Sequence, residues 1–162
     1  MGAVVSESQL IEAVARDRRQ GRTIAFANGC FDVLHVGHVR YLQGAVAEAD
    51  RLVVAVNDDQ SVASLKGLGR PFLTAADRAA LVGAVRGVDY VVIFGDRTAE
   101  RLLLLLRPHV HCKGTDYTVE SVPERAVVLA YGGRTAIVGD PKTHASRDLL
   151  TRIARSATPT NN

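Results

Sequence analysis

Two histidines stand three residues apart in NGCFDVLHVGH, residues 28–38. This stretch follows an apolar run, TIAFA, and precedes a segment with helical periodicity, so the histidines fall where a strand turns into a helix. The first turn of a helix has unpaired N–H groups and a partial positive charge, which together bind anions. His35 and His38 can each donate to a phosphate oxygen, and Gly37 lets a phosphate approach the backbone. The pattern indicates charge stabilisation during phosphoryl or nucleotidyl transfer.

Two other interpretations of these histidines are open. Histidines near a helix start can be capping or surface residues, and for an arbitrary H-x-x-H pair that interpretation is favoured. A metal-binding pair on a helix is usually spaced i, i+4, and no third ligand is evident in the sequence. The position between a strand and a helix favours the transfer site.

The remaining sequence predicts the elements that would position such a site. Apolar runs rich in β-branched residues are typical of strands buried on both faces, and they occur at 23–28, 51–57, 89–94, 109–112 and 134–139. A first helix follows a Ser6–Gln9 capping box and ends near Gly21. Later helical stretches alternate with the strands at 38–48, 74–86, 97–107, 122–131 and 145–155. The alternation predicts an α/β fold: a single Rossmann-like open parallel sheet of about five strands with helices on both faces.

Length and charge bound the possible classes of protein. The 162 residues suit one domain, expected at 1–155 with a disordered tail at 156–162. The net charge of +3 is spread along the chain, and the arginine cluster at 16–22 is interrupted by Asp17, which indicates a solvated helix face rather than a nucleic-acid interface. The apolar run at 102–106 is too short to span a bilayer. With two cysteines and no disulfide framework, we expect a soluble cytoplasmic protein that binds neither nucleic acid nor membrane.

Several motifs carry a resemblance to a known superfamily. GCFDVLHVGH resembles the signature of the nucleotidylyltransferases, whose H-x-G-H motif binds the nucleoside triphosphate. Within that superfamily, the D-glycero-β-D-manno-heptose 1-phosphate adenylyltransferases are similar from about Leu10 to Ile153, and the shared motifs are NGCFDVLHVGHVRYL, VAVNDDQSV, LKGLGRP and KGTDY. The resemblance implies that ATP and a heptose 1-phosphate give ADP-heptose and pyrophosphate, with Mg²⁺ on the ATP and no metal bound directly by the protein. It implies a stand-alone homodimer or higher homo-oligomer, supplied with substrate by a separate sugar kinase.

The resemblance also implies roles for individual residues. Lys66, in a glycine-rich connection after a short helix, would join His35 and His38 as a catalytic residue by contacting phosphate. The nucleotide would be bound by Asn28, Gly29, Cys30, Phe31, Gly37, Arg78, Lys113, Gly114, Ser146 and Arg147. The sugar phosphate would be bound by Asp32, Asp59, Arg70, Asp116 and Tyr117.

Each of these residues also has a purely structural interpretation. Lys66 and Arg70 suit a solvated loop, Asp59 suits a helix N-cap, and Arg78 would by default be an exposed arginine. The KGTDY stretch follows the fourth strand, where a turn would explain its glycine and aspartate.

The last motif departs from the family pattern. Where the family usually has H-S-T-T, this chain has His144, Ala145, Ser146 and Arg147. Ser146 keeps one hydroxyl at a helix start, and Arg147 either replaces a hydroxyl by charge or points away. Two alternative functions follow: a cytidylyltransferase acting on glycerol 3-phosphate or another polyol phosphate, and a non-catalytic nucleotide sensor.

Overall fold

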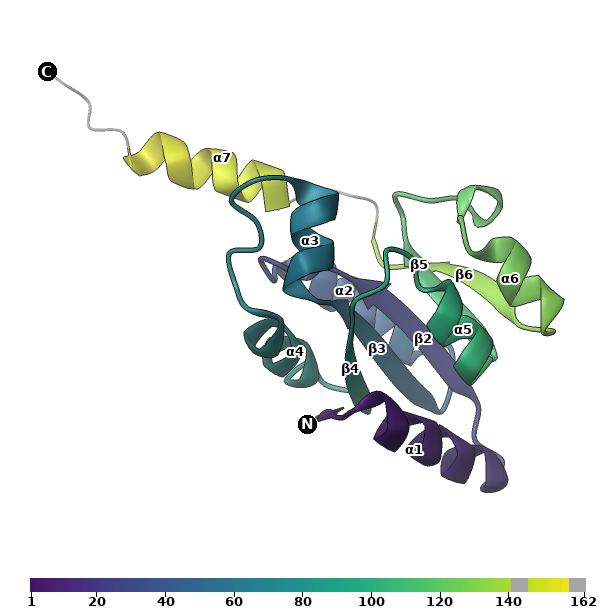
Figure 1. Ribbon diagram of the computed structural model, residues 1–162. Helices are drawn as coiled ribbons and strands as arrows, with labels where there is room; N and C mark the ends of the chain where they lie inside the picture. The colour runs from purple at the N-terminus through teal and green to yellow at the C-terminus, as the bar shows by residue number, and fades with distance from the viewer. Residues whose placement is uncertain (141–145, 158–162) are drawn as a thin grey trace, which may run out of the picture.

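The structure is a computed structural model that describes residues 1–140 and 146–157, with side chains omitted at 146–149 and 156–157. Its strands are β1 (Ala3–Val4), β2 (Ile24–Gly29), β3 (Arg51–Asn57), β4 (Tyr90–Phe94), β5 (Val110–Gly114) and β6 (Arg134–Val138). Its helices are α1 (Glu7–Arg19), α2 (Val36–Val46), α3 (Asp59–Lys66), α4 (Ala75–Gly83), α5 (Glu100–Leu106), the 3-10 turn η1 (Val119–Ser121), α6 (Arg125–Ala130) and α7 (Ser146–Ala157). Figure 1 shows these elements in place.

The strands form one sheet in the order β1-β4-β3-β2-β5-β6, and every pair is parallel. The expected open parallel sheet is confirmed, with six strands rather than about five. The additional strand is β1, whose two residues pair with Tyr90 and Val91 at the edge of the sheet. A two-residue strand is too short to show the apolar pattern that identified the others.

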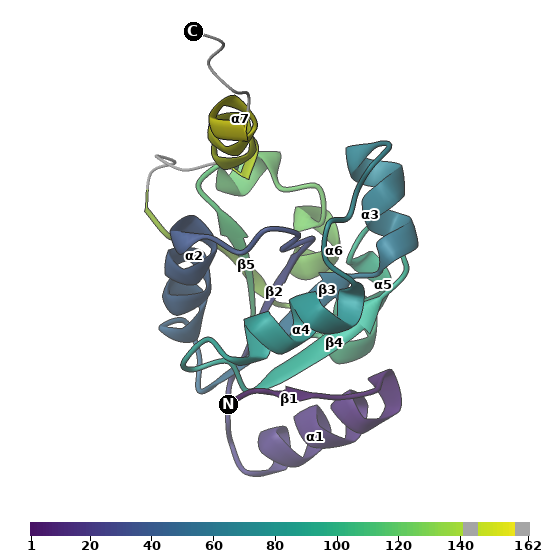
Figure 2. The same ribbon diagram turned by 90° about the vertical axis from the view of Figure 1, so that its left-hand side faces the viewer.

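Helices cover both faces of the sheet, as expected. On one face, α2 and α4 pack Leu42, Ala45 and Val82 against alternate residues of β2 and β3. On the other face, α1, α5 and α6 pack Leu10, Leu103 and Val128 against the intervening residues. Figure 1 shows α5 in front of the sheet and α2 behind it, and Figure 2 shows α2 and α4 on one side of the strands with α5 and α6 on the other. Strands buried on both faces explain the nearly continuous apolar runs in the sequence.

Local signals set most of the boundaries. Ser6 and Gln9 form the expected capping box of α1. The helix expected from residue 38 begins at Val36 instead, because His35 caps it. The strand expected at 109–112 continues to Gly114, because its last two residues pair with Ile137 and Val138 of β6.

At the carboxyl-terminal end, α7 continues to Ala157, two residues into the stretch expected to be a disordered tail. Residues 158–162 lie outside the described part of the chain. Among the described residues, no helix has both the length and the apolar character needed to cross a membrane.

Candidate active site

The strand order reverses beside β2. From β2 the chain adds β3 and then β4 on one side, and it later crosses over so that β5 pairs with the other side of β2. Loops that follow the two strands at such a reversal diverge, and open α/β sheets bind ligands there. The loops at this reversal are 30–35 and 115–118, so NGCFDVLHVGH and KGTDY meet at the same edge of the sheet.

The two histidines use one ring nitrogen each to begin α2. His35 is the N-cap, and its Nδ1 accepts a hydrogen bond from the N–H of Gly37 at 3.1 Å. Nδ1 of His38 accepts a longer bond from the N–H of His35 at 3.4 Å, and the two rings stack with centroids 3.9 Å apart. Because each Nδ1 is an acceptor, a neutral ring carries its proton on Nε2. Capping and function are therefore compatible, since Nδ1 caps the helix while Nε2–H is a donor.

Phe31 supports the histidines from inside the protein. Its backbone is in the left-handed region (φ 48°), which costs a residue other than glycine about 1–3 kcal/mol. Its buried ring contacts the His38 ring edge-on at 5.4 Å and stacks on Tyr41 at 6.5 Å. A Cβ at Gly29 would lie 3.1 Å from the Phe31 ring, so this close approach explains the glycine. Phe31 and Gly29 thus shape the loop, with the Phe31 ring directed into the core.

Three cationic residues lie near enough to the thiol of Cys30 to affect its pKa. Burial raises the pKa of this half-buried cysteine, while the charges of Lys66, Arg78 and Arg70 lower it and Asp32 raises it. The thiol is therefore protonated at neutral pH and is a poor nucleophile. Two of these cations are paired with carboxylates, Arg70 with Asp32 and Arg78 with Asp59, so Lys66 is the cation of the three for which no ion pair is found within the described part of the chain.

Arg78 is completely buried, so the default interpretation as an exposed arginine is wrong. Its Nε donates to the carbonyl of Leu73 at 3.0 Å, and one terminal nitrogen donates to the carbonyls of Cys30 and Asn57 at 2.6 and 2.7 Å. The other terminal nitrogen donates to Asp59 Oδ1 at 2.7 Å. These bonds tie α4 to the ends of β2 and β3, and they engage the guanidinium inside the protein.

Asp59 does not cap α3 as the sequence suggested. The N-cap is Asp58, whose Oδ1 accepts the N–H of Ser61 at 2.7 Å. Asp59 is the first helical residue, and its half-exposed carboxylate pairs with Arg78. Lys66 is likewise helical, as the exposed last residue of α3, rather than part of the glycine-rich connection.

Asp32 anchors the connection that follows Lys66. One carboxylate oxygen accepts the N–H groups of Phe72 and Leu73 at 2.6 and 3.2 Å, and the carboxylate forms an ion pair with Arg70. The guanidinium of Arg70 also lies over the Phe72 ring, 4.5 Å from its centroid. Asp32 is itself buried, with 3% of its surface exposed. It therefore fixes the connection to the loop that carries the histidines.

Replacing Asp32 with asparagine should free this connection. The variant loses the ion pair and weakens two charge-assisted hydrogen bonds, worth about 1.5–3 kcal/mol each. We expect trypsin to cleave after Lys66 at least about tenfold faster than in the unmodified protein. Asp77→Asn, which changes an exposed acid at the start of α4, should leave the cleavage rate unchanged. An unchanged rate in Asp32→Asn would mean that the carboxylate does not hold this connection.

A network of buried polar side chains lies at the ends of β2 and β5. Lys113 Nζ donates to Asn28 Oδ1 at 3.2 Å and lies 3.4 Å from both carboxylate oxygens of Glu124. His111 Nε2 lies 3.1 Å from the same Asn28 oxygen. Burial lowers the pKa of His111 to about 3, so this ring is neutral. Asn28 and Lys113 were expected at the site, and the structure brings them into direct contact.

The loop after β5 contains Asp116 and Tyr117 of the KGTDY motif. The N–H of Tyr117 donates to the carbonyl of Gly114 at 3.1 Å, which closes a turn, and Asp116 is exposed. The Tyr117 ring faces the Lys113 ammonium, with Nζ 5.5 Å from its centroid. Ser146 is the first residue of α7, but its side chain and that of Arg147 lie outside the described part of the chain, as do His144 and Ala145.

Three buried polar residues near the site were missed from the sequence: His111, Asn57 and Glu124. His111 and Lys113 are two apart on one strand and so share a face, which was an available signal. Asn57 ends β3 beside Cys30, whose Sγ lies 3.9 Å from its Oδ1. Glu124 had no signal, because a lone acid eleven residues after Lys113 has no motif or period that relates the two.

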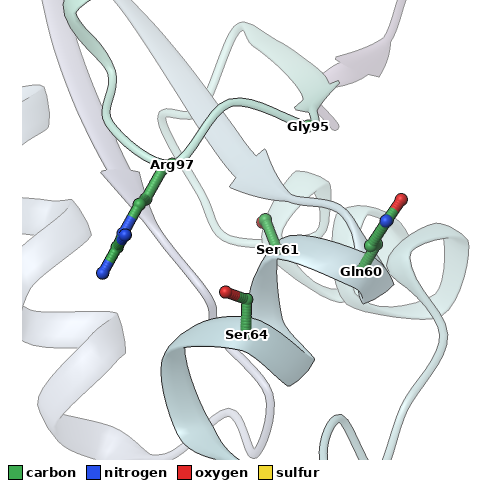
Figure 3. Close-up of a pocket in the computed structure, with 5 residues that line it drawn as sticks. All are labelled: Gln60, Ser61, Ser64, Gly95 and Arg97. Carbon is green, nitrogen blue, oxygen red and sulfur yellow. The ribbon is translucent and has the colours of Figure 1, made fainter.

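A separate open groove of about 280 Å³ lies on another face of α3. Its lining residues are Gln60, Ser61, Ser64, Gly95 and Arg97, from α3 and from the connection after β4 (Figure 3). Helical periodicity places Ser61 and Ser64 away from Asp59. None of these residues was predicted to bind a ligand.

The described part of the chain has no group of three His, Cys, Asp or Glu side chains placed to hold a metal ion. Asp32 and Asp59 are engaged with Arg70 and Arg78. This donor set suits Mg²⁺ that arrives on phosphate oxygens and keeps several waters, which is the usual state of the ion in nucleotide sites.

Comparison with known proteins gives relatives that are similar in sequence and a solved structure that is similar in fold. "Bifunctional protein HldE" of Pseudomonas aeruginosa (strain LESB58) is 45% identical over 150 residues, and that of Azotobacter vinelandii is 43% identical over 152. These matches cover 93% and 94% of this chain but 32% of each relative, so the chain spans about a third of their length. The crystal structure of a lipopolysaccharide core biosynthesis protein from Thermoplasma volcanium GSS1 shares the fold with a TM-score of 0.65. That match is 22% identical and covers 75% of this chain and 100% of that one.

The profile of one protein family matches most of the sequence. The family is described as cytidylyltransferase-like, and the match covers residues 26–156, from within β2 to the penultimate residue of α7. The match includes both histidines, Lys66, Arg78 and the KGTDY stretch. The chain therefore belongs to the cytidylyltransferase-like family.

Proposed function

We propose that the chain is a nucleotidylyltransferase that transfers AMP from ATP to a heptose 1-phosphate. The observation that carries this proposal is the pair His35 and His38 at the start of α2, where both Nδ1 atoms accept backbone N–H groups, so that a neutral ring carries its proton on Nε2. They lie at the strand reversal of an open α/β sheet, beside cations that act on Cys30. Donors, a helix start and cations at one place suit a triphosphate.

The chemistry needs no covalent intermediate. A phosphate oxygen of the sugar phosphate attacks the α-phosphorus of ATP, forming one P–O bond while the bond to the β-phosphate oxygen breaks. Pyrophosphate leaves with that electron pair. His35, His38 and Lys66 stabilise the charge that grows on the transferred and departing phosphates. Mg²⁺ enters with ATP as part of the substrate and neutralises phosphate charge when bound. Cys30, held as a thiol, takes no part as a nucleophile.

The other expected residues surround this centre in distinct ways. The nucleotide is bound at the ends of β2 and β5 by Asn28, Lys113 and Gly114. Gly37, Ser146 and Arg147 also bind it. Arg78, Gly29 and Phe31 act on the nucleotide through the loop that they support. The sugar phosphate is bound by Asp59, Asp116 and Tyr117. Asp32 and Arg70 hold the connection after Lys66 in place beside it.

The choice of ATP and heptose rests on the four motifs that resemble heptose 1-phosphate adenylyltransferases. A separate sugar kinase upstream is part of the proposal, and the relatives of about three times this length are described as bifunctional. A homo-oligomer in the cytoplasm remains part of the proposal.

Nucleotide and acceptor choice test the proposal. Pyrophosphate release should be fastest with ATP and a heptose 1-phosphate, and at least about tenfold slower when CTP replaces ATP, because one lost base contact is worth about 1.4 kcal/mol or more. A panel of four nucleoside triphosphates against heptose 1-phosphate, glycerol 3-phosphate and another polyol phosphate provides the measurement. Efficient use of CTP with glycerol 3-phosphate would assign the chain to the cytidylyltransferases instead. Nucleotide binding without pyrophosphate release on any acceptor would favour a sensor.

A further inference from the structure

Lys113 is held in an unusual environment for a lysine at a ligand site. Only 10% of its side chain is exposed, and Glu124, whose side chain is 5% exposed, lies 3.4 Å from Nζ. Glu124 belongs to the connection between η1 and α6, eleven residues further along the chain. A buried ion pair costs desolvation energy, and removal of one partner leaves the other charge uncompensated. Such a pair at the edge of a ligand site therefore needs a reason beyond stability.

Asn28 joins the pair to the end of β2. Its Oδ1 receives Lys113 Nζ at 3.2 Å and lies 3.1 Å from His111 Nε2. The neutral His111 ring donates there when its proton is on Nε2, and an ammonium can only donate. Two donors on one amide oxygen fix the orientation of the Asn28 amide, so its NH₂ group is directed away from both. Lys113 and Asn28 thereby form one preorganised pair of donors.

We infer that Glu124 is a positioning residue of the nucleotide site, which holds the Lys113 ammonium charged and in place beside Asn28 to receive a phosphate of the nucleotide. The inference rests on the proposed nucleotide site. Glu124 itself does not touch the substrate and acts through Lys113. A surface lysine would need no such partner, but a lysine at this depth does.

The charged groups around Lys113 make this role of Glu124 measurable as a pH dependence of nucleotide binding. Burial lowers the pKa of Lys113, and Glu124 raises it. The other groups near Nζ are the Asn28 amide of β2, the Tyr117 ring and the neutral His111, which shares the Asn28 oxygen. The charge of Glu124 also acts on Tyr41 of α2, whose pKa is raised chiefly by burial. On β6, the residue in register with Lys113 is Ile137. Glu124 is thus the anion facing Lys113 among the described residues.

The sign of the expected change follows from these causes. Without the Glu124 charge, the pKa of Lys113 falls further, so the ammonium is lost at a lower pH. Phosphate affinity that depends on this ammonium then decreases as pH rises through the lowered pKa. Each pH unit above that pKa removes about nine-tenths of the remaining charged form.

The test compares Glu124→Gln with Glu120→Gln, which removes an exposed acid from η1 of the same connection. The chain has only three lysines, Lys66, Lys113 and Lys142, so ¹³C-labelled lysine gives three NMR signals, and Lys113→Met identifies the Lys113 signal by its loss. The pKa of Lys113 is measured in the ligand-free protein. The dissociation constant of Mg·ATP is then measured at pH 7 and pH 9.

We expect a lower Lys113 pKa in Glu124→Gln than in the unmodified protein, and an unchanged one in Glu120→Gln. ATP binding should weaken about tenfold or more from pH 7 to pH 9 in Glu124→Gln, but less than about threefold in the unmodified protein and in Glu120→Gln. In the Lys113→Met background, Glu124→Gln should add no pH dependence. If Glu124→Gln does not fold, Glu124→Asp keeps the charge but shortens its reach and should give an intermediate pKa.

Three results would overturn the inference. An unchanged Lys113 pKa in Glu124→Gln and Glu124→Asp would show that Glu124 does not hold the charge. A lowered pKa with ATP binding that is equal at both pH values would show that Lys113 does not receive the nucleotide, while leaving the histidine site intact. Absence of ATP binding by the unmodified protein would instead remove the proposed function itself, and this inference with it.

Discussion

Replacing His38 with alanine is expected to lower kcat by about two to three orders of magnitude while the fold is retained. Loss of one preorganised donor to a charged transition state has a cost of this size. The structural cost should be small, because the contact that His38 makes to the His35 N–H is long, at 3.4 Å. Steady-state pyrophosphate release and a melting curve measure both quantities on one preparation.

Two companion variants make this prediction specific. Gln43→Ala, at an exposed position later in α2, should leave kcat unchanged. His35→Ala should lower kcat similarly but should also lower the melting temperature, because His35 is the N-cap of α2 and loss of a cap costs about 1 kcal/mol. If His38→Ala keeps near-normal kcat, the histidine pair is only structural and the proposed transfer step is wrong.

Arg78→Met should give the largest loss of stability. The buried guanidinium satisfies three backbone carbonyls and Asp59, and methionine leaves the carbonyls without these donors. We expect the free energy of unfolding to fall by about 3–5 kcal/mol, since each unsatisfied buried group costs about 1–3 kcal/mol. For a chain of this size the melting temperature should fall by roughly 10 °C.

The matched control is Arg86→Met, which removes an exposed arginine from the turn that follows α4. It should change stability by less than about 0.5 kcal/mol. Arg78→Lys should rescue little, because an ammonium cannot reproduce the planar set of donors. A loss below about 1 kcal/mol in Arg78→Met would show that these carbonyls find other partners and that Arg78 does not tie α4 to the strands.

Much of the scaffold could be predicted from sequence because buried parallel strands have a strong compositional pattern. The run predicted at 51–57 has the same ends as β3, and the run predicted at 134–139 is one residue longer than β6. Boundaries moved where a tertiary contact or a side-chain cap decides them. β5 is longer because β6 pairs with Lys113 and Gly114, and α2 begins earlier because His35 can act as a cap. Neither effect can be read from local periodicity.

The site was predictable where a motif carries it and not where distant residues converge. His35, His38 and Lys113 were selected by spacing and by resemblance, and the structure places their elements at one strand reversal. The burial of Arg78 was missed because an arginine on a helix gives no local sign of the carbonyls that it will meet. Glu124 was missed for the same reason, since its pairing with Lys113 exists only after β5 and α6 have packed.

The most direct test of the central proposal follows the phosphorus atoms of ATP. The purified chain is incubated with a heptose 1-phosphate and with Mg·ATP that carries ³²P at either the α or the γ position, and the products are separated. Direct nucleotidyl transfer predicts that the α label appears in an ADP-sugar and the γ label in pyrophosphate, in equal amounts. The γ label in a sugar phosphate or in free phosphate, or both labels still in ATP, would contradict nucleotidyl transfer by this chain.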